Sequence, residues 1–409
     1  MSRVVVTGMG VVCPLGTDVD AFADALLAGR SAVGPITHFD ATGLTTRIGA
    51  EVRAVLDSPL GDRKIGFALA AARAAVSDAG GAPDGPGGIA MGVGLELLSM
   101  PDLVARRAGA PLPIEREQRL AFMQTPSDLS VHLIACEHGL TVPPRIHVSA
   151  CAAGTDAIGD AFRAVRSGRA RWMLAGGTDS MLNPLGVAGF CALKATSTRN
   201  DEPTRASRPF DVGRDGFVMG EGAGVLLLES LESARARGAR IHAEVLGHGS
   251  ALDAYLISDP HPEGRGALAA MQRALRDASL GADAIGAINA HGTGTPKNDP
   301  AESAAIEALF DHDLPRARRV PVSATKSMIG HLVSAAGAVE AIAAIACMQR
   351  GMVHPTINLD EPDPLCRLDY VPRVAREHAY DVVLSTSYGF GGHDSALLLG
   401  RWRDGDARR

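Results

Sequence analysis

The chain has 409 residues, of which 46% are apolar, 21% are charged and only 4% are aromatic, and its formal net charge is −6. This composition is typical of a soluble α/β protein with closely packed helices, and the length fits either two domains or one unit of two intimately packed halves. The acidic balance argues against a nucleic-acid-binding protein, because no basic excess is present to neutralise phosphates.

The first predicted element is a strand, Val4-Val-Val-Thr-Gly8, which begins almost at the N-terminus. Nothing with the features of a secretory signal precedes it, so we expect a cytoplasmic protein. The longest apolar stretch, Ala335 to Met348, is interrupted by Glu340 and is shorter than the roughly 20 residues that cross a bilayer. We expect a buried helix there and no association with a membrane.

Three short matches, in the same order along the chain, indicate an internal duplication. The matched pairs are 8–10 with 247–249, 69–79 with 268–278, and 148–150 with 322–324. The separation between partners falls along the chain, so the first half carries extra loops, which we place near residues 15–65 and 92–140. We assign residues 1–240 to an N-terminal half and 241–409 to a C-terminal half.

Each half is expected to run strand, helix, strand, helix, strand and to close with a hairpin, marked by residues 220–228 and 389–399. Strands that alternate with helices imply largely parallel sheets buried on both faces. The third match places the turn with Thr325-Lys326 where the first half has the turn with Ala150-Cys151. A pseudo-twofold axis would bring these turns together at the C-terminal ends of strands, where ligands collect.

Cys151 lies between a strand-like segment, 145–150, and a helical pattern that begins at Ala152. At a helix N-terminus the free N–H groups and the helix dipole favour thiolate over thiol, so we expect a lowered thiol pKa and a nucleophilic role. His291 and His331 each lie in a Gly-rich turn directly after an apolar strand. One thiol and two imidazoles predict an active site that both halves build.

The other cysteines have no catalytic partner pattern, and the six together contain no CxxC pair, which indicates neither a zinc site nor a disulfide framework. They are Cys13, Cys136, Cys191, Cys347 and Cys366. We interpret them as inert thiols, and we expect no metal and no bound cofactor.

Several motifs, all in order, resemble those of the β-ketoacyl-acyl-carrier-protein synthases, condensing enzymes of thiolase fold, over nearly the whole chain. They are VVVTGMGVVCPLG from residue 4, VSACAAGTDAIGDA from 148, STRNDEPTRASRPFDVGRDGFVMGEGAGVLLLE from 197, NAHGTGTPKND from 289, SATKSMIGH from 323 and STSYGFGG from 385. The resemblance implies an α/β fold of two pseudo-symmetric βαβαβ halves packed as a five-layer αβαβα sandwich.

The resemblance also implies roles for individual residues. Cys151 would accept the acyl chain, and His291 and His331 would complete a Cys-His-His set. Lys326 and Glu340 would form a supporting ion pair. The backbone N–H groups of Cys151 and Phe390 would form the oxyanion hole, the Phe390 side chain would gate the acyl pocket, and Thr293 and Thr295 would contact the phosphopantetheine arm of the substrate carrier.

The implied activity is a decarboxylative Claisen condensation, in which malonyl carrier protein extends a Cys151-bound acyl chain by two carbons. The expected partners are an acidic acyl carrier protein and a second subunit, either identical or a related chain-length factor. The basic residues considered for docking the carrier are Arg63, Lys64, Arg205 and Arg208.

Other interpretations stay open at this point. The chain could be a non-catalytic chain-length-factor subunit of the same fold, although such subunits typically replace the nucleophile, or a cysteine thioester hydrolase. The pathway is also open, because His393-Asp394 after GFGG and Asp156 depart from the fatty-acid pattern and favour type II polyketide or polyene synthesis. The segment from Glu96 to Ile134 departs most.

Overall fold

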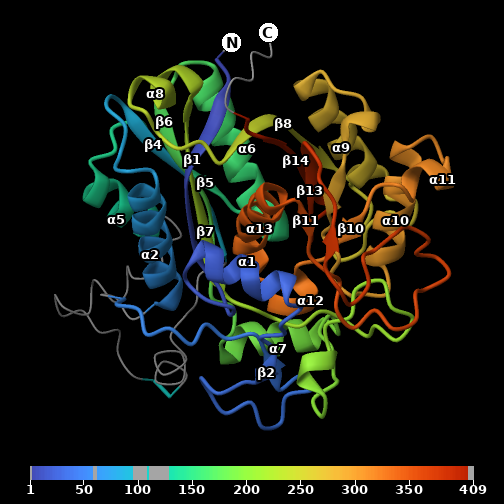
Figure 1. The fold of residues 1–409 in the computed structure, drawn as a ribbon. Coiled ribbons are helices and arrows are strands. Elements are labelled where there is room, and N and C mark those ends of the chain that lie inside the picture. Colours follow the sequence, from blue (N-terminus) through green and yellow to red (C-terminus); the bar gives the residue numbers. More distant parts are fainter. Residues whose placement is uncertain (1, 59–61, 95–107, 110–128, 404–409) are drawn as a thin grey trace.

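The computed structural model describes residues 2–58, 62–94, 108–109 and 129–403. A mixed sheet with the strand order β10-β9-β13-β14-β8-β1-β7-β6-β4-β5 runs through the molecule (Figure 1). Its strands are β1 (Val4–Val12), β4 (Gly87–Val93), β5 (Arg145–His147), β6 (Trp172–Asp179), β7 (Gly222–Ser230), β8 (Ala243–Leu252), β9 (Ala287–Asn289), β10 (Val322–Ser323), β13 (Val382–Gly389) and β14 (His393–Arg401).

The strand order repeats. The first half is arranged β1-β7-β6-β4-β5 and the second half β8-β14-β13-β9-β10, so strands of the same rank occupy the same position in each half. The halves meet where β1 pairs antiparallel with β8, over Val4–Val6. The predicted duplication is therefore confirmed, and its two sheets are hydrogen-bonded edge to edge into one.

The helices form three layers around these strands. α2 (Arg63–Asp78) packs on β1, β7 and β6, with α5 (Leu129–His138) beside it, and α9 (Arg265–Ala278) packs on β8 and β14, with α10 (Asn298–Leu309) beside it. Between the half-sheets lie α6 (Ala153–Arg166) and α13 (Ala336–Arg350), which contact strands of both halves. Figure 1 shows α13 at the centre, in agreement with the predicted five layers.

Glycines at one strand position in each half allow the outer helices to approach closely. A Cβ at Gly8 would lie 2.0 Å from Ala75 O of α2, and a Cβ at Gly247 would lie 2.6 Å from Ala274 O of α9. Both distances are too short for any side chain, so the matched glycines of the sequence repeat have a packing reason.

The closing strand pairs differ in their connections. β13 and β14 form a tight hairpin in which Gly389 pairs with His393. β6 and β7 are also antiparallel, but residues 180–221 separate them, so the prediction of a hairpin is wrong for the first half. This insertion carries α7 (Pro184–Ala192), which covers the site described below.

The predicted extra loop near 15–65 contains α1 (Val19–Leu27) and the short pair β2 (Gly34–Pro35) and β3 (Ile48–Gly49). Most of the loop near 92–140, and most of the divergent segment 96–134, lies outside the described residues. The remaining elements are α8 (Leu231–Ala236), α11 (Leu314–Ala317), α12 (Lys326–Ile329), β11 (Met352–Val353) and β12 (Arg376–Glu377). The division at residue 240 stays a prediction, although β8 opens the second repeat at Ala243.

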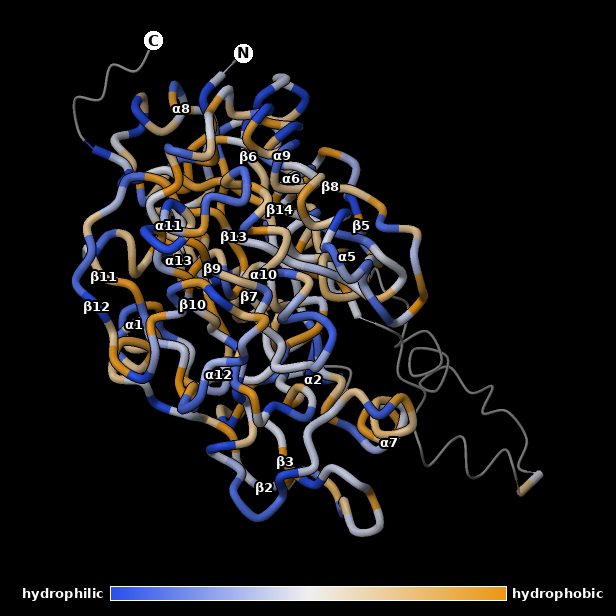
Figure 2. Tube along the Cα trace, turned by 90° about the vertical axis from the view of Figure 1, so that its right-hand side faces the viewer, coloured by the Kyte–Doolittle hydropathy of each residue, from blue (hydrophilic) through white to orange (hydrophobic). Residues whose placement is uncertain are grey.

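The apolar stretch around α13 is a core helix, as predicted. Residues 333–350 are long and apolar enough to cross a membrane by length and composition, but 89% of this stretch is buried inside the protein. Figure 2 shows hydrophobic residues concentrated along the inner strands and α13, with hydrophilic residues on the outer loops.

The central helices begin in the same way. A short 3₁₀ turn precedes each of them, and the first residue of this turn has a positive φ, 48° at Ala150 and 46° at Val333. Cys151-Ala-Ala-Gly154 therefore corresponds to Ser334-Ala-Ala-Gly337. The prediction that the Lys326 turn takes the place of the Cys151 turn is wrong. A segment that contains α12 is inserted between β10 and α13, and the match between the preceding strands gives no sign of this insertion.

Candidate active site

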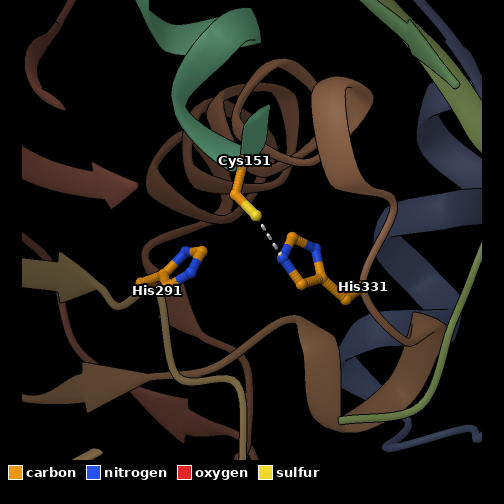
Figure 3. Close-up of side chains that lie close together, drawn as sticks. All are labelled: Cys151, His291 and His331. Atoms are coloured by element: carbon orange, nitrogen blue, oxygen red, sulfur yellow. Dashed lines mark hydrogen bonds between the residues drawn. The ribbon is translucent and has the colours of Figure 1, made fainter. Parts of the chain in front are cut away.

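Cys151, His291 and His331 meet at the seam between the halves (Figure 3). Cys151 lies in the 3₁₀ turn before α6, His291 follows β9, and His331 follows α12. Cys151 Sγ is 3.0 Å from His331 Nε2, and one ligand atom from each residue lies within 4.8 Å of the others. All three are buried, and the structure brings the predicted set together.

Hydrogen bonds to the far side of each ring define the proton positions on the imidazoles. The Val333 N–H donates to His331 Nδ1 at 3.1 Å, and Lys326 Nζ lies 3.3 Å from His291 Nδ1. Burial, followed by the charge of Lys326, lowers the pKa of both histidines well below the usual value, so the rings are neutral. With Nδ1 accepting, each ring carries its proton on Nε2 and directs that donor into the site, where the donor of His331 faces Cys151 Sγ.

The thiol differs from the expectation. Burial raises the pKa of the Cys151 thiol to about 12, although the Lys326 charge and the N–H groups of Phe390 and Cys151 favour the thiolate. The predicted lowering is wrong, because removing the sulfur from water outweighs the favourable groups around it. The sulfur therefore rests as a thiol, and its ionisation must accompany attack on a substrate.

Lys326 and Glu340 form a buried ion pair behind the histidines. Lys326 Nζ is 2.5 Å from Glu340 Oε1, and both side chains are 1% exposed. Burial raises the pKa of Glu340 to about 7, against the opposing charge of Lys326. Because the same ammonium group reaches His291, the pair links α13 to the proton position on that ring.

We expect Lys326→Met to destabilise the protein by about 3–5 kcal/mol, because it leaves Glu340 buried without a counter-charge. A buried carboxyl with a raised pKa binds more protons in the folded state, so the variant should lose stability as the pH rises through that pKa. Urea unfolding at about pH 5.5 and pH 8 measures both effects. Lys326→Met/Glu340→Leu is the control and should recover most of the stability; a single variant as stable as the parent at pH 8 contradicts the role of the pair.

The turn after β13 lies against the Cys151 turn. A Cβ at Gly389 would lie 2.7 Å from Ser149 O and 3.4 Å from Cys151 N, so only glycine permits this approach. The N–H of Phe390 and that of Cys151 both favour negative charge on Sγ. Two N–H donors from opposite halves therefore lie close to the sulfur, which is the kind of arrangement an oxyanion hole requires.

A cavity of about 340 Å³ contains the three residues and leads away from them. Thr293 and Thr295 line it, with their hydroxyl oxygens 3.0 Å apart, and Phe390 lies at its wall with its ring centroid 6.4 Å from that of Phe190. The Phe390 side chain is 36% exposed, so the cavity wall extends to the protein surface. The cavity therefore connects the three residues with the protein surface.

Sequence reasoning missed the acids that hold the His291 turn. Glu302 accepts hydrogen bonds from the N–H groups of His291 and Gly292, each at 2.8 Å, and from Thr386 Oγ1 at 2.9 Å. Asp299, one turn earlier on α10, accepts from Gly294 N at 3.2 Å. The available signal was two acids, one helical turn apart, directly after the AHGTGT turn. Sequence reasoning also missed the loop 253–260, which lines the cavity.

The structure corrects the residues considered for carrier docking. Lys64 is 2% exposed and Arg208 is 7% exposed, so neither lies on a docking surface. The Arg63 side chain is about one-third exposed, and its guanidinium pairs with the buried Glu221 at 2.5 Å. Arg205 is the most exposed of the four and pairs with Asp360 at 2.8 Å. These four residues were chosen for their charge alone. Charge does not distinguish a basic residue in a structural ion pair from one on a solvent-exposed surface.

By distance alone, Cys151, His291 and His331 are compatible with a metal ion. A metal bound through Nε2 would have to displace the proton that each ring carries there, beside the Lys326 ammonium group that repels a cation. The donor set therefore does not fit a metal well, and the expectation of no metal stays a prediction.

Comparison with known proteins identifies the family. Residues 1–234 match the beta-ketoacyl synthase N-terminal domain and residues 242–360 match the C-terminal domain. A 3-oxoacyl-[acyl-carrier-protein] synthase 2 of Synechocystis is 42% identical, with 98% of each chain covered. Two solved structures align with 98% of this chain, and the alignment includes the whole of each solved chain.

The first, a type II polyketide synthase acyl-carrier protein in complex with its ketosynthase bound to the hexaketide, has a TM-score of 0.89 and 33% identity. The second, the ishigamide ketosynthase/chain length factor, has a TM-score of 0.88 and 36% identity. Sequence, fold and site geometry agree: the chain belongs to the beta-ketoacyl synthase family.

Proposed function

We propose that this protein is a ketosynthase that condenses malonyl carrier protein with an acyl chain bound to Cys151, extending the chain by two carbons. The observation that carries the proposal is the pair of neutral imidazoles, each directing its Nε2–H into the site, beside one thiol and at the end of a cavity that extends to the surface.

In the first step the Cys151 sulfur attacks the thioester carbonyl of the acyl carrier protein. The new S–C bond forms a tetrahedral intermediate, and the N–H groups of Cys151 and Phe390 stabilise its oxyanion. The C–S bond to the phosphopantetheine arm then breaks, and the thiol proton leaves with the departing sulfur. Thr293 and Thr295, which line the cavity, contact that arm.

In the second step malonyl carrier protein loses carbon dioxide. The electron pair of the broken C–C bond forms an enolate whose charge lies on the thioester oxygen, where Nε2–H of His291 and His331 donates. Because these donors stabilise the enolate more than the neutral thioester, they lower the barrier. The enolate carbon attacks the acyl carbonyl, and the bond to Cys151 breaks with its electron pair on the sulfur. The thiolate then takes a proton from solvent, which restores the resting thiol.

The carrier protein supplies its own phosphopantetheine, so no resident cofactor is required. For docking, we favour the cavity wall, where Lys194 is exposed and Lys297 is two-thirds exposed and pairs with Asp259. Arg205 stays a candidate. An acidic carrier is suited to such residues, and a cytoplasmic location agrees with soluble carriers.

We further propose that the protein works as a dimer, with an identical subunit or with a related chain-length factor. Within the described residues, β5 pairs with β4 on one side and its other edge is free. The adjacent side chains are apolar and open to solvent, with Ile146 37% and Val148 61% exposed. An unpaired edge with apolar neighbours favours strand pairing with a second subunit.

The alternative functions are less consistent with the site. A non-catalytic subunit has no need for an intact thiol with two oriented imidazoles. A cysteine hydrolase needs a carboxylate or amide to orient its histidine, whereas His331 Nδ1 accepts from the backbone N–H of Val333. The pathway is either type II polyketide or polyene synthesis or fatty-acid synthesis, and His393-Asp394 favour the former.

Intact-mass analysis of the protein with acyl and malonyl carrier proteins tests the proposal. We expect an acyl adduct on Cys151 and, after the malonyl carrier is added, a ketoacyl carrier two carbons longer with release of carbon dioxide. Free acid without a ketoacyl product would identify a hydrolase, and no adduct at all would identify a non-catalytic subunit. Acyl donors of several lengths and starter types, in the same assay, distinguish the pathways.

A further inference from the structure

A buried carboxylate joins the turn that carries Phe390 to the turn that carries Cys151. Asp156 lies in the first turn of α6 and is 5% exposed. Its Oδ2 accepts a hydrogen bond from Ser149 Oγ at 2.6 Å, and His393 Nε2 lies 2.8 Å from the same oxygen. Ser149 precedes Cys151 by two residues and His393 follows Phe390 by three, so Asp156 connects the flanks of both N–H donors.

The second histidine near Asp156 does not supply a charge. His248 Nε2 is 3.7 Å from Asp156 Oδ1, and Arg163 Nη1 is 2.8 Å from His248 Nδ1. Because a guanidinium group only donates, His248 Nδ1 accepts, and burial lowers the pKa of His248. Asp156, by contrast, raises the pKa of His393. The cation facing Asp156 at short range is therefore His393.

The other side of the Phe390 turn is held by backbone contacts. Asp253 N donates to Gly392 O at 2.6 Å, and Gly391 N donates to Ile257 O at 2.7 Å, so the loop 253–260 supports the side away from Cys151. On the side toward Cys151, the turn is held by an ionic contact, that of His393 with Asp156. The two oxyanion donors belong to opposite halves, and nothing covalent near the site fixes their separation.

We propose that His393 is a positioning residue for acyl transfer: its imidazolium holds the Phe390 turn against the Cys151 turn through Asp156, so that both backbone N–H groups face one oxyanion. The inference rests on the proposed function and deepens it for the step in which the S–C bond to Cys151 forms. His393 itself touches no substrate.

The test compares two reactions of Cys151. Transfer from an acyl N-acetylcysteamine thioester forms an oxyanion, whereas alkylation by iodoacetamide displaces iodide without one. In His393→Leu we expect acylation to fall at least about tenfold, because displaced donors lose the oxyanion, and alkylation to stay within about twofold. His393→Gln keeps a donor at about the reach of Nε2 toward Asp156 and should recover part of the acylation rate. His312→Gln, at an exposed histidine, is the matched control.

The ratio of the two rates also reports the charge on His393, because ionisation of the thiol affects both reactions and cancels. The titratable groups near His393 are Asp156 on α6 and Asp394 on β14, with Asp253 beside Asp394 and the neutral His248 beside Asp156. The acylation-to-alkylation ratio of the parent should fall as the pH rises through the His393 pKa. In both His393 variants it should be independent of pH in that range.

An equal loss of acylation and alkylation in His393→Leu would show a general structural role and overturn the proposal. A parent whose acylation-to-alkylation ratio does not change with pH would overturn it as well. Both readouts precede decarboxylation. A protein that acylates Cys151 but forms no ketoacyl product would therefore refute the condensing activity while leaving the result for His393 intact.

Discussion

Cys151→Ala is expected to reduce acyl transfer at least about 10⁴-fold, to background. The sulfur is the proposed nucleophile and lies beside both imidazoles and both backbone donors, and the structure places no second thiol in the cavity among the described residues. Alanine removes the bond-forming atom and leaves the surrounding donors in place. Incubation with acyl carrier protein, followed by intact-mass analysis, measures the adduct.

Cys13→Ala is the matched control for this variant. Cys13 is also buried, and burial raises the pKa of its thiol to about 12, but it lies at the end of β1 away from the cavity. The Cys13→Ala protein should therefore form the acyl adduct as the parent does. An adduct of normal size on the Cys151→Ala protein would remove Cys151 from the proposed mechanism.

His291→Ala is expected to accept the acyl chain while losing condensation about 10²–10³-fold, the usual effect of removing one donor to a developing oxyanion. Acylation uses the N–H groups of Cys151 and Phe390, whereas the enolate needs the Nε2–H that Lys326 orients. Single-turnover assays measure the adduct first and the ketoacyl product second.

His291→Gln tests whether donation is the function of this ring, because its amide N–H reaches about as far as Nε2–H. We expect partial recovery of condensation. Thermal unfolding of both variants separates loss of chemistry from loss of fold. Condensation at the parental rate in His291→Ala refutes the assignment of that residue.

The repeated fold was predictable because its signals are local. Gly8 and Gly247 are required where a strand touches a helix backbone, so the packing constraint left the same residue at the same place in each half. Cys151 and His291 were predictable because each lies in a turn after a strand, and strand ends of one sheet gather at one edge. His331 was expected directly after a strand but follows α12, so its place was predicted for the wrong reason. These signals do not depend on knowing the rest of the structure.

Other properties depend on the three-dimensional environment and could not be predicted in this way. The pKa of Cys151 is decided by burial, which many distant segments produce together. Glu302 supports His291 through the backbone N–H, and two acids after the AHGTGT turn do not by themselves show which backbone groups they hold. Lys64 and Arg208 were chosen as surface charges, but a basic residue in a sequence does not show whether a carboxylate already faces it.

The matching starts of α6 and α13 have a consequence for the number of active sites. A scaffold built from two copies offers two equivalent turns, but only one carries a sulfur. At the other, Ser334 is 1% exposed and its N–H donates to Asp179 Oδ2 at 3.0 Å, so this turn serves as an internal anchor. The inserted segment places His331 beside the Cys151 turn and Lys326 beside His291. A twofold framework thus carries one candidate active site in the described part of the chain.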